Sequence, residues 1–562
     1  MLGRMLAGWL SLRANSALRC YRRATAARER GDWARAVHWY RRALAQRPDH
    51  AEAQNDLGVA LCALHEYAGA RAAFTQALAA CAELVPAHVN LGQLLQSEFR
   101  DYRNAIGHYR AALAIDPGQQ QAITGLGVSL YECGEVEEAI ACLREALQDS
   151  PADALVHQFM LFMSNALPQR DRQHWYAEHC RWGRRYADVL PRYTHTPGPV
   201  RRRVHIGYVS ADLREHATAN FIHPILACHD PDLFEVFCYT NSAEADAVTG
   251  KMQRLAHRWR AIDGLDDAAA AQLIRADGID ILIDVSGHTS GNRLLLFGRK
   301  PAPLQVSFLG YLNTTGMKAI DYRISDSYAD PPGVSDCVHT EKLLRLPRTL
   351  WCYRPPEDAP PVSELPALRR GHVTFASFNH IAKLNPRVLE LWADLLRQVP
   401  GSRLLVMAVP DEGAAARIRR GLAGIDEDRV STLGRLGRAG YWQQFAAVDI
   451  ALDPFPYAGG ATTCDTLWMG VPVVTLAGDY GFSRSGVTIL ANAGLSHLIA
   501  QTAEDYVGLA RGLASDLEGL TRLRAGMRER LRSSPLTDAS AYARDLESAY
   551  RDIWRDWCGV HD

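Results

Sequence analysis

Residues 448–476 read VDIALDPFPYAGGATTCDTLWMGVPVVTL, and this stretch decides the fold. Its first apolar run, Val448–Leu452, ends at a proline-rich segment that neither a helix nor a central strand can continue through. A glycine-rich turn then opens a segment of helical length, and a second apolar run, Val471–Leu476, follows. The pattern predicts strand, turn, helix and strand, which is typical of a parallel α/β sheet.

The glycine-rich turn is the first candidate binding site. A turn of this kind at a helix start exposes unpaired backbone N–H groups and the partial positive charge of the helix, about half an elementary charge. Thr462 and Thr463 add hydroxyl groups, and Asp465 stands in the first helical turn, where a carboxylate is favourable. These features predict a diphosphate site. Because short glycine motifs are weakly specific, an ordinary turn capped by threonine stays open as the alternative.

Bulk composition narrows the class of protein. A chain of 562 residues is too long for one core, so two to four domains are expected. The net charge of −1 argues against nucleic acid or an anionic membrane surface as a partner. Twelve cysteines without a C-x-x-C pair indicate reduced thiols and a cytoplasmic protein. No run approaches the ~20 apolar residues of a transmembrane helix, and the N-terminus is expected to form a helix rather than a signal peptide.

Residues 17–150 carry an internal repeat with a step of 34 or 35 residues. Small alanines recur at two fixed positions, and a large side chain recurs at a third, where we expect it to fill the gap between paired helices. The large residues are Tyr40, Phe74, Tyr109 and Leu143. The pattern resembles the tetratricopeptide repeat, whose arrays form a concave groove that binds extended peptide.

After the repeats, short apolar runs alternate with helix-length segments, which predicts two α/β lobes with a cleft between them. The domains expected are repeats (1–151), a helical junction and linker (152–199), a first lobe (200–356), a linker (357–371), a second lobe (372–540) and a closing helix (541–562). The strands expected besides those above are Val204–Val209, Phe234–Tyr239, Ile279–Val285, Gln305–Leu309, Val373–Phe378, Leu404–Val409 and Val430–Leu433.

Three further residues stand at strand ends, where ligands bind in such sheets. His216 and His288 follow two strands of the first lobe, and each is a candidate general base or sugar contact. Lys383 follows a strand of the second lobe in a chain with only five lysines. A charge pair at 4 Å and an effective dielectric of about 20 is worth ~4 kcal/mol, so a lysine aimed at a departing phosphate contributes substantially. For each residue an ordinary structural or solvated side chain stays the alternative.

Several motifs together closely resemble the protein O-linked N-acetylglucosamine transferase family, in a bacterial form. They are YVSADLREHATANF, GHTSGNR, RKPAPLQVSFLGYLNTTG, FASFNHIAKLNP and GGATTCDTLWMGVPVVTL. The resemblance implies a repeat superhelix followed by a two-lobed GT-B region with Rossmann-like halves. It also implies a UDP-GlcNAc donor, no metal or other cofactor, inversion at the anomeric carbon, and a protein or peptide acceptor lying along the repeat groove.

The resemblance also assigns roles to residues. His216 matches the proposed catalytic base, Lys383 the diphosphate contact, and Thr462 and Asp465 the phosphate and ribose contacts. The donor-binding positions carried over are His288, His380, Lys383, Leu436, Arg438, Tyr441, Gly460, Ala461, Thr462, Thr463 and Asp465.

This chain also departs from the animal members. His380 replaces glutamine, Ala382 replaces tyrosine, Arg438 replaces lysine, Tyr441 replaces histidine, and Gly460-Ala461-Thr462 replaces His-Thr-Thr. These departures concern the nucleotide and sugar contacts more than the phosphate site. Two alternatives therefore stay open: transfer of a hexose such as glucose to asparagine side chains, and a repeat scaffold with a degenerate transferase half.

Overall fold

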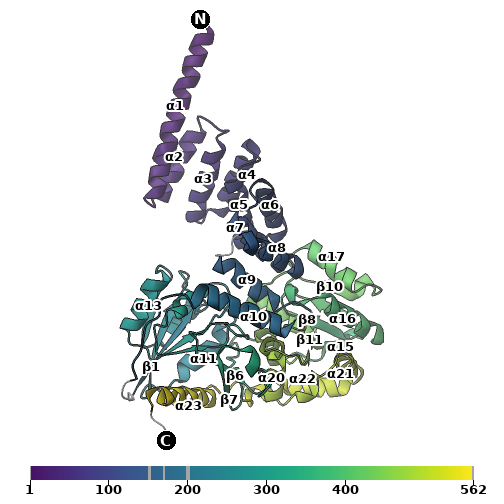
Figure 1. The fold of residues 1–562 in the computed structure, drawn as a ribbon. Helices are drawn as coiled ribbons and strands as arrows, with labels where there is room; N and C mark the ends of the chain where they lie inside the picture. Colours follow the sequence, from purple (N-terminus) through teal and green to yellow (C-terminus); the bar gives the residue numbers. More distant parts are fainter. Residues whose placement is uncertain (1, 150–152, 169–170, 198–202, 560–562) are drawn as a thin grey trace. The chain divides into compact units, whose positions relative to one another are not determined.

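The computed structural model describes residues 2–149, 153–168, 171–197 and 203–559. The chain divides into two compact units, Met1–Pro151 and Ala152–Asp562 (Figure 1). Pro151 and the expected boundaries near residues 151 and 199 lie outside the described residues. Within the described ranges, no helix is both long and apolar enough to cross a membrane.

The first unit consists of antiparallel helix pairs, as the repeat predicts. Its helices are α1 (Leu2–Glu29), α2 (Trp33–Leu44), α3 (Ala51–Ala63), α4 (Tyr67–Ala80), α5 (Val85–Leu94, continued by a π-turn to Phe99), α6 (Tyr102–Ile115), α7 (Gln120–Glu132) and α8 (Val136–Asp149).

The large repeat residues fill the gaps between paired helices. A Cβ atom placed on Gly58 would lie 2.5 Å from the ring of Phe74, and one on Gly125 would lie 2.3 Å from the ring of Tyr109. The ring of Tyr109 approaches Gly92 as well, at 2.8 Å. Only glycine leaves room for these side chains, so the expected repeat packing is confirmed.

The second unit begins with α9 (Ala154–Ser164) and α10 (Arg172–Trp182), followed by a seven-stranded parallel sheet. The strand order is β3-β2-β1-β4-β5-β6-β7. The strands are β1 (Val204–Ser210), β2 (Phe234–Thr240), β3 (Arg258–Ala261), β4 (Ile281–Asp284), β5 (Leu304–Ser307), β6 (Tyr322–Asp326) and β7 (Lys342–Leu346). Its connecting helices are α11 (Ala219–Cys228), α12 (Ala247–Gln253), α13 (Asp267–Ala276) and α14 (Leu294–Gly298).

A second parallel sheet of six strands, in the order β10-β9-β8-β11-β12-β13, forms the other lobe. Both strands of the opening stretch are present, as β11 (Ile450–Leu452) and β12 (Val473–Leu476). The others are β8 (Thr374–Ser377), β9 (Arg403–Val406), β10 (Val430–Thr432) and β13 (Ile499–Ala500). The helices are α16 (Pro386–Gln398), α17 (Glu412–Gly421), α18 (Arg438–Gln444), α19 (Ala461–Trp468), α20 (Ser485–Asn492), α21 (Ala503–Ser515) and α22 (Leu517–Arg532).

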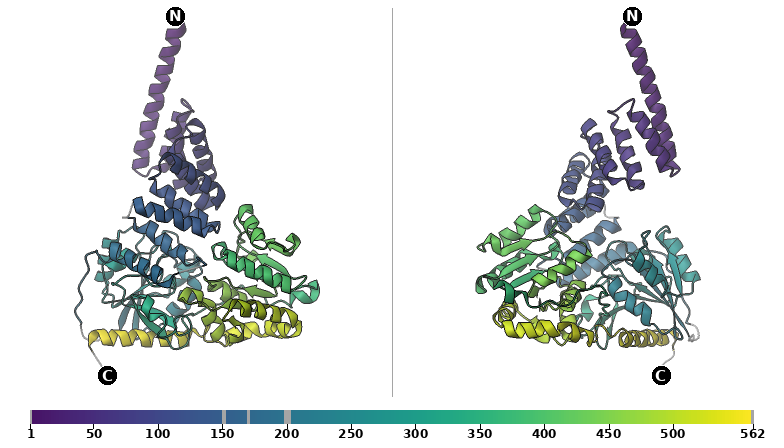
Figure 2. Two further views of the ribbon diagram at one scale, coloured as in Figure 1. Left: turned by 45° about the vertical axis from the view of Figure 1, so that its right-hand side comes forward. Right: turned by 180° about the vertical axis from the view of Figure 1, so that it is seen from behind.

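The segment expected to link the lobes is packed rather than free. It contains a short helix, α15 (Pro366–Arg370), and the buried guanidinium of Arg524 donates to the carbonyl of Ser363 at 2.8 Å. The last helix, α23 (Ala539–Cys558), returns to the first lobe, where Glu547 accepts a hydrogen bond from His229 at 2.9 Å. Both views of Figure 2 show this yellow helix along the teal lobe. The architecture of helical repeats followed by two Rossmann-like halves is therefore confirmed.

Candidate active site

A cavity of about 730 Å³ lies between the two lobes of the second unit. Its walls come from α11, α12 and the loop before α11 in the first lobe, from residues 354–358 between the lobes, and from α18, α19 and the loops after β8, β9 and β10 in the second lobe. Among the described residues, those expected in the site that line it are His216, Leu436, Arg438, Tyr441, Thr462 and Asp465.

The glycine turn is held by a buried carboxylate. The side chain of Asp453 accepts a hydrogen bond from Gly459 N–H at 2.7 Å and another from the Thr475 hydroxyl at 2.8 Å. Burial raises the pKa of Asp453 to about 6, and these donors and the nearby ammonium of Lys383 oppose that rise. A Cβ atom on Gly459 would lie 2.6 Å from the Thr463 hydroxyl, so the turn fits closely against the start of α19.

Asn379 joins Lys383 to the start of α19. Its side-chain oxygen accepts from the ammonium of Lys383 at 3.4 Å and from the Thr462 hydroxyl at 3.2 Å. Lys383 also donates to the Ala458 carbonyl at 2.9 Å. Lys383 is not among the residues that line the cavity. The side chain of Asn379 nevertheless connects its ammonium to Thr462, which does line the cavity.

The ammonium of Lys383 is partly desolvated. It lies 4.1 Å from the ring centroid of Tyr457, and burial lowers the pKa of Lys383 to about 8, an effect that Asp453 opposes. A cation with so few water contacts interacts strongly with an anion placed beside it, because little hydration is lost when the anion arrives.

Asp465 is held by two tyrosines. The hydroxyl of Tyr353 donates to one carboxylate oxygen at 2.6 Å, and that of Tyr441 donates to the other at 3.3 Å. Burial raises the pKa of Asp465 to about 6, against the effect of these hydrogen bonds and of Arg438. The carboxylate is therefore fixed in orientation at the cavity wall.

Arg438 is paired across the cavity rim. Its guanidinium donates two hydrogen bonds to Asp358, at 2.9 and 2.8 Å, and lies 3.7 Å from Glu215 in the first lobe. These contacts raise the pKa of Arg438. The residue expected at the nucleotide is thus engaged by two carboxylates, one from the linker and one from the first lobe.

His216 lies on the loop before α11, with its side chain 43% exposed. Its Nδ1 accepts a hydrogen bond from the backbone N–H of Thr218 at 3.3 Å. The Thr218 hydroxyl and an Asp212 carboxylate oxygen lie near the same nitrogen, at 3.1 and 3.6 Å, and the tautomer that accepts from the Thr218 N–H carries its proton on Nε2. Burial lowers the pKa of His216, although Asp212 opposes the shift, so the neutral form is favoured at neutral pH.

The remaining candidates lie off the cavity wall. His288 is fully buried, its Nε2 pairs with the Thr315 carbonyl at 2.9 Å, and its ring packs edge-on against Trp182. Burial lowers the pKa of His288 to about 3. The expectation that His288 contacts the donor therefore has no support in the lining of the cavity. Thr463 is likewise buried.

His380 lies just before Lys383 and contributes to the local turn. Its Nδ1 accepts from the N–H of Ala382 at 3.2 Å, which begins the 3-10 turn Ile381–Lys383. Gly460 and Ala461, at the start of α19, are partly exposed. None of these three is among the described residues that line the cavity.

Sequence reasoning missed three residues that organise the site: Asn379, Tyr353 and Asp358. Asn379 lies in the same strand-end motif as Lys383. Its position four residues before that lysine could have predicted that its side chain belongs to the site. Tyr353 lies just before the interlobe linker and Asp358 lies within it, and only the tertiary fold brings them to α19 and α18.

No group of three or more histidine, cysteine, aspartate or glutamate side chains in the described part of the chain is arranged to hold a metal ion. The described residues in and beside the cavity present two ammonium groups (Lys251 on the wall and Lys383 beside it), a helix start, carboxylates and two histidines, together with the guanidinium groups of Arg354, Arg435 and Arg438.

Comparison with known proteins shows which family contains this fold and cavity. The sequence profile of glycosyl transferase family 41 matches residues 178–353 and 364–546, and tetratricopeptide repeat profiles match 21–84 and 97–160. The chain belongs to glycosyl transferase family 41. The matched segments include both sheets, so the two lobes are the family 41 region and the first unit is a tetratricopeptide repeat region.

Several curated relatives come from plants. A rice protein named probable UDP-N-acetylglucosamine–peptide N-acetylglucosaminyltransferase SPINDLY is 39% identical over 75% of this chain and 46% of the relative. The tomato SPINDLY protein is 40% identical over 73% of this chain and 45% of its own length. The Arabidopsis SEC protein, with the same enzyme name, is 30% identical over 68% and 41%. The chain thus spans about half the length of these relatives.

One solved structure matches both units. It is described as a mutant of the Thermobaculum terrenum O-GlcNAc transferase, is 35% identical, and aligns with a TM-score of 0.81 over 98% of this chain and 99% of that one. The resemblance to a bacterial O-linked N-acetylglucosamine transferase is confirmed.

Proposed function

We propose that this chain is an inverting, metal-independent glycosyltransferase that moves N-acetylglucosamine from UDP-GlcNAc to serine and threonine hydroxyls of proteins. The observation that carries the proposal is the junction of Lys383, Asn379 and Thr462 at the start of α19, beside the interlobe cavity of a family 41 protein. The acceptor protein is proposed to bind along the repeats.

The proposed reaction is a single displacement. The acceptor oxygen attacks the anomeric carbon, the bond from that carbon to the β-phosphate oxygen breaks, and UDP leaves with the negative charge. Lys383 and the N–H groups at the start of α19 stabilise this developing charge. Asp465, held by Tyr353 and Tyr441, accepts hydrogen bonds from the ribose hydroxyls.

His216 is proposed to act as a hydrogen-bond donor rather than as the base. In the tautomer whose Nδ1 accepts from the Thr218 N–H, the ring offers Nε2–H to a phosphate or sugar oxygen. The acceptor proton is then taken up by water or by a leaving phosphate oxygen.

A pair of substitutions tests this role. We expect His216→Ala to lower kcat about 10²-fold, the value of a hydrogen bond to a charged group. We expect His216→Gln to lose less than about tenfold, because its amide N–H replaces Nε2–H. Steady-state kinetics at saturating donor measure the difference. Equal inactivity of the two variants would instead support a base, since glutamine cannot take a proton.

The pKa of Lys383, about 8, predicts a pH dependence. The ammonium is present below this pH and lost above it, so kcat/KM should fall up to tenfold per pH unit above about pH 8. In the donor complex the negative charge of the bound diphosphate raises the pKa of Lys383. We therefore expect kcat, which reports on this complex, to stay constant to a higher pH than kcat/KM does. Profiles of both parameters measure this, and kcat/KM that stays flat to pH 10 would refute an essential ammonium.

The function itself is tested by incubating the full chain with a cell lysate and radiolabelled UDP-GlcNAc or UDP-glucose. We expect label from UDP-GlcNAc in protein that alkaline β-elimination releases. Preferential label from UDP-glucose that resists β-elimination would indicate transfer to asparagine. Absence of both UDP binding and transfer would indicate a scaffold.

A further inference from the structure

The first helix pair carries an excess of positive charge. Residues 15–50 contain nine arginines and three carboxylates, Glu29, Asp32 and Asp49, whereas the whole chain has a net charge of −1. Asp32 caps α2 by accepting from the Arg35 N–H, and Asp49 lies 3.6 Å from Arg47. The helix pair α1 and α2 is therefore basic although the chain as a whole is nearly neutral.

Six of these arginines are exposed and have no carboxylate partner among the described residues: Arg19, Arg22, Arg23, Arg30, Arg35 and Arg42. By contrast, Arg28 pairs with Asp56 and Arg41 with Glu66. Arginines that stabilised only the repeat would be expected in such pairs, so the unpaired ones are available to another molecule.

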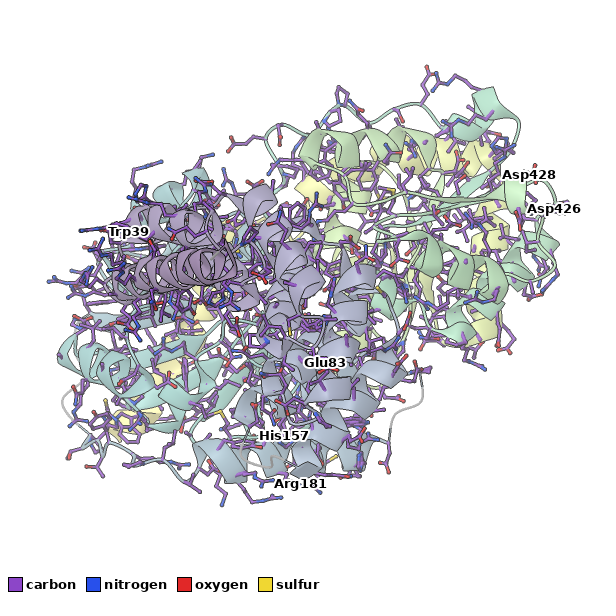
Figure 3. The ribbon with its side chains drawn as sticks, turned by 90° about the horizontal axis from the view of Figure 1, so that it is seen from above. Trp39, Glu83, His157, Arg181, Asp426 and Asp428 are labelled. Atoms are coloured by element: carbon purple, nitrogen blue, oxygen red, sulfur yellow. The ribbon has the colours of Figure 1, made fainter. Side chains whose placement is uncertain are left out.

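Trp39 shows that arginines of both helices lie on one face. The guanidinium carbon of Arg23 in α1 lies 4.8 Å from the ring centroid of Trp39, and that of Arg42 in α2 lies 5.1 Å from it. Nitrogen-tipped side chains gather around the labelled Trp39 in Figure 3. Helical spacing places Arg19 beside Arg23, four residues on, and Arg35 beside Trp39.

We propose that this surface, the arginine face (Arg19, Arg22, Arg23, Arg35, Trp39 and Arg42), binds an acidic segment of a polypeptide. Arginines four residues apart on a helix are about 6 Å apart along its axis, and alternate side chains of an extended peptide are about 6.6 Å apart. A strand-like segment with carboxylates at every second residue matches that spacing and meets several guanidinium groups at once.

A peptide fits better than nucleic acid or membrane. Binding to single-stranded nucleic acid uses aromatic faces for base stacking, but two guanidinium groups cover the half-buried Trp39. The neutral charge of the chain as a whole gives little long-range attraction to a large polyanion. The arginine face does not depend on the proposed transferase activity.

The test uses the full chain and a fluorescein-labelled peptide of alternating glutamate and serine, measured by fluorescence anisotropy. The combined variant Arg19→Gln, Arg22→Gln and Arg35→Gln leaves both guanidinium groups over Trp39 in place. The matched control neutralises three exposed arginines elsewhere in the repeats, Arg71, Arg110 and Arg144. Circular dichroism checks that both variants remain folded, as expected for exposed sites.

We expect the variant to bind the glutamate peptide roughly tenfold more weakly, since each exposed ion pair contributes a factor of a few. The control should bind like the unmodified chain, and a peptide with glutamine in place of glutamate should not bind. The proposal is overturned if the unmodified chain does not bind the peptide, if the variant binds as tightly, or if an RNA oligonucleotide or phosphatidylserine vesicles bind more tightly through the same arginines.

Discussion

Replacing Lys383 by methionine is expected to lower kcat by about 10²–10³-fold while the fold persists. Methionine keeps much of the length and apolar contact of the lysine stem but removes the charge that faces the departing diphosphate. Because burial already disfavours the ammonium, its removal should not destabilise the lobe. Transfer rates at saturating donor, together with a thermal melt, measure both effects.

The matched control is Lys342→Met. Lys342 lies in β7, is exposed, and also sits over an aromatic ring, with its ammonium 5.9 Å from the centroid of Tyr322. We expect its loss to change kcat less than about twofold, because Lys342 lies in an edge strand of the first lobe, whereas Lys383 is joined through Asn379 to Thr462 on the cavity wall. Near-normal transfer by Lys383→Met, or an equal loss in both variants, would remove Lys383 from the mechanism.

Gly459→Ala is expected to be the second most damaging change. The new Cβ would lie 2.6 Å from the Thr463 hydroxyl, 2.7 Å from that of Thr462 and 3.0 Å from the Asp453 carboxylate. The turn must shift, which costs about 1–3 kcal/mol of stability. A displacement of about 1 Å at the start of α19 should lower kcat/KM by roughly 10²-fold. Donor kinetics and thermal melts of the variant give both numbers.

Gly508→Ala provides the comparison, since Gly508 lies within α21 and an added Cβ meets open space. Alanine there should stabilise the helix slightly and leave kcat/KM unchanged. If Gly459→Ala were as active as Gly508→Ala, the close fit of the turn to α19 would have no role in donor binding.

The strands predicted from the sequence are those in which apolar residues predominate. Four strands were not predicted: β3 (RWRA), β6 (YRISD) and β7 (KLLRL), in which charged residues interrupt the apolar pattern, and the two-residue β13. β3 and β7 are edge strands, where charged side chains reach solvent and are common. The interlobe segment was expected to be a linker because of its prolines, but tertiary contacts to Arg524 order it.

The parts of the site that could be predicted are those whose functional residues lie within a recognisable local sequence pattern. The turn before α19 and Lys383 could be recognised because glycine, threonine and a lone lysine follow strands. Tyr353 could not, because its contact with Asp465 joins residues more than a hundred positions apart in sequence. His288 was singled out by the same strand-end rule, yet the packing of Trp182 buries it.

Calorimetric titration of the unmodified chain and of Lys383→Met with UDP and with uridine tests most directly whether α19 and Lys383 together hold a diphosphate. We predict that UDP binds the unmodified chain much more tightly than uridine does, and that Lys383→Met weakens UDP at least tenfold while leaving uridine unchanged. Equal affinities of the two ligands for the unmodified chain, or a variant that binds UDP as tightly as the unmodified chain, would contradict the account.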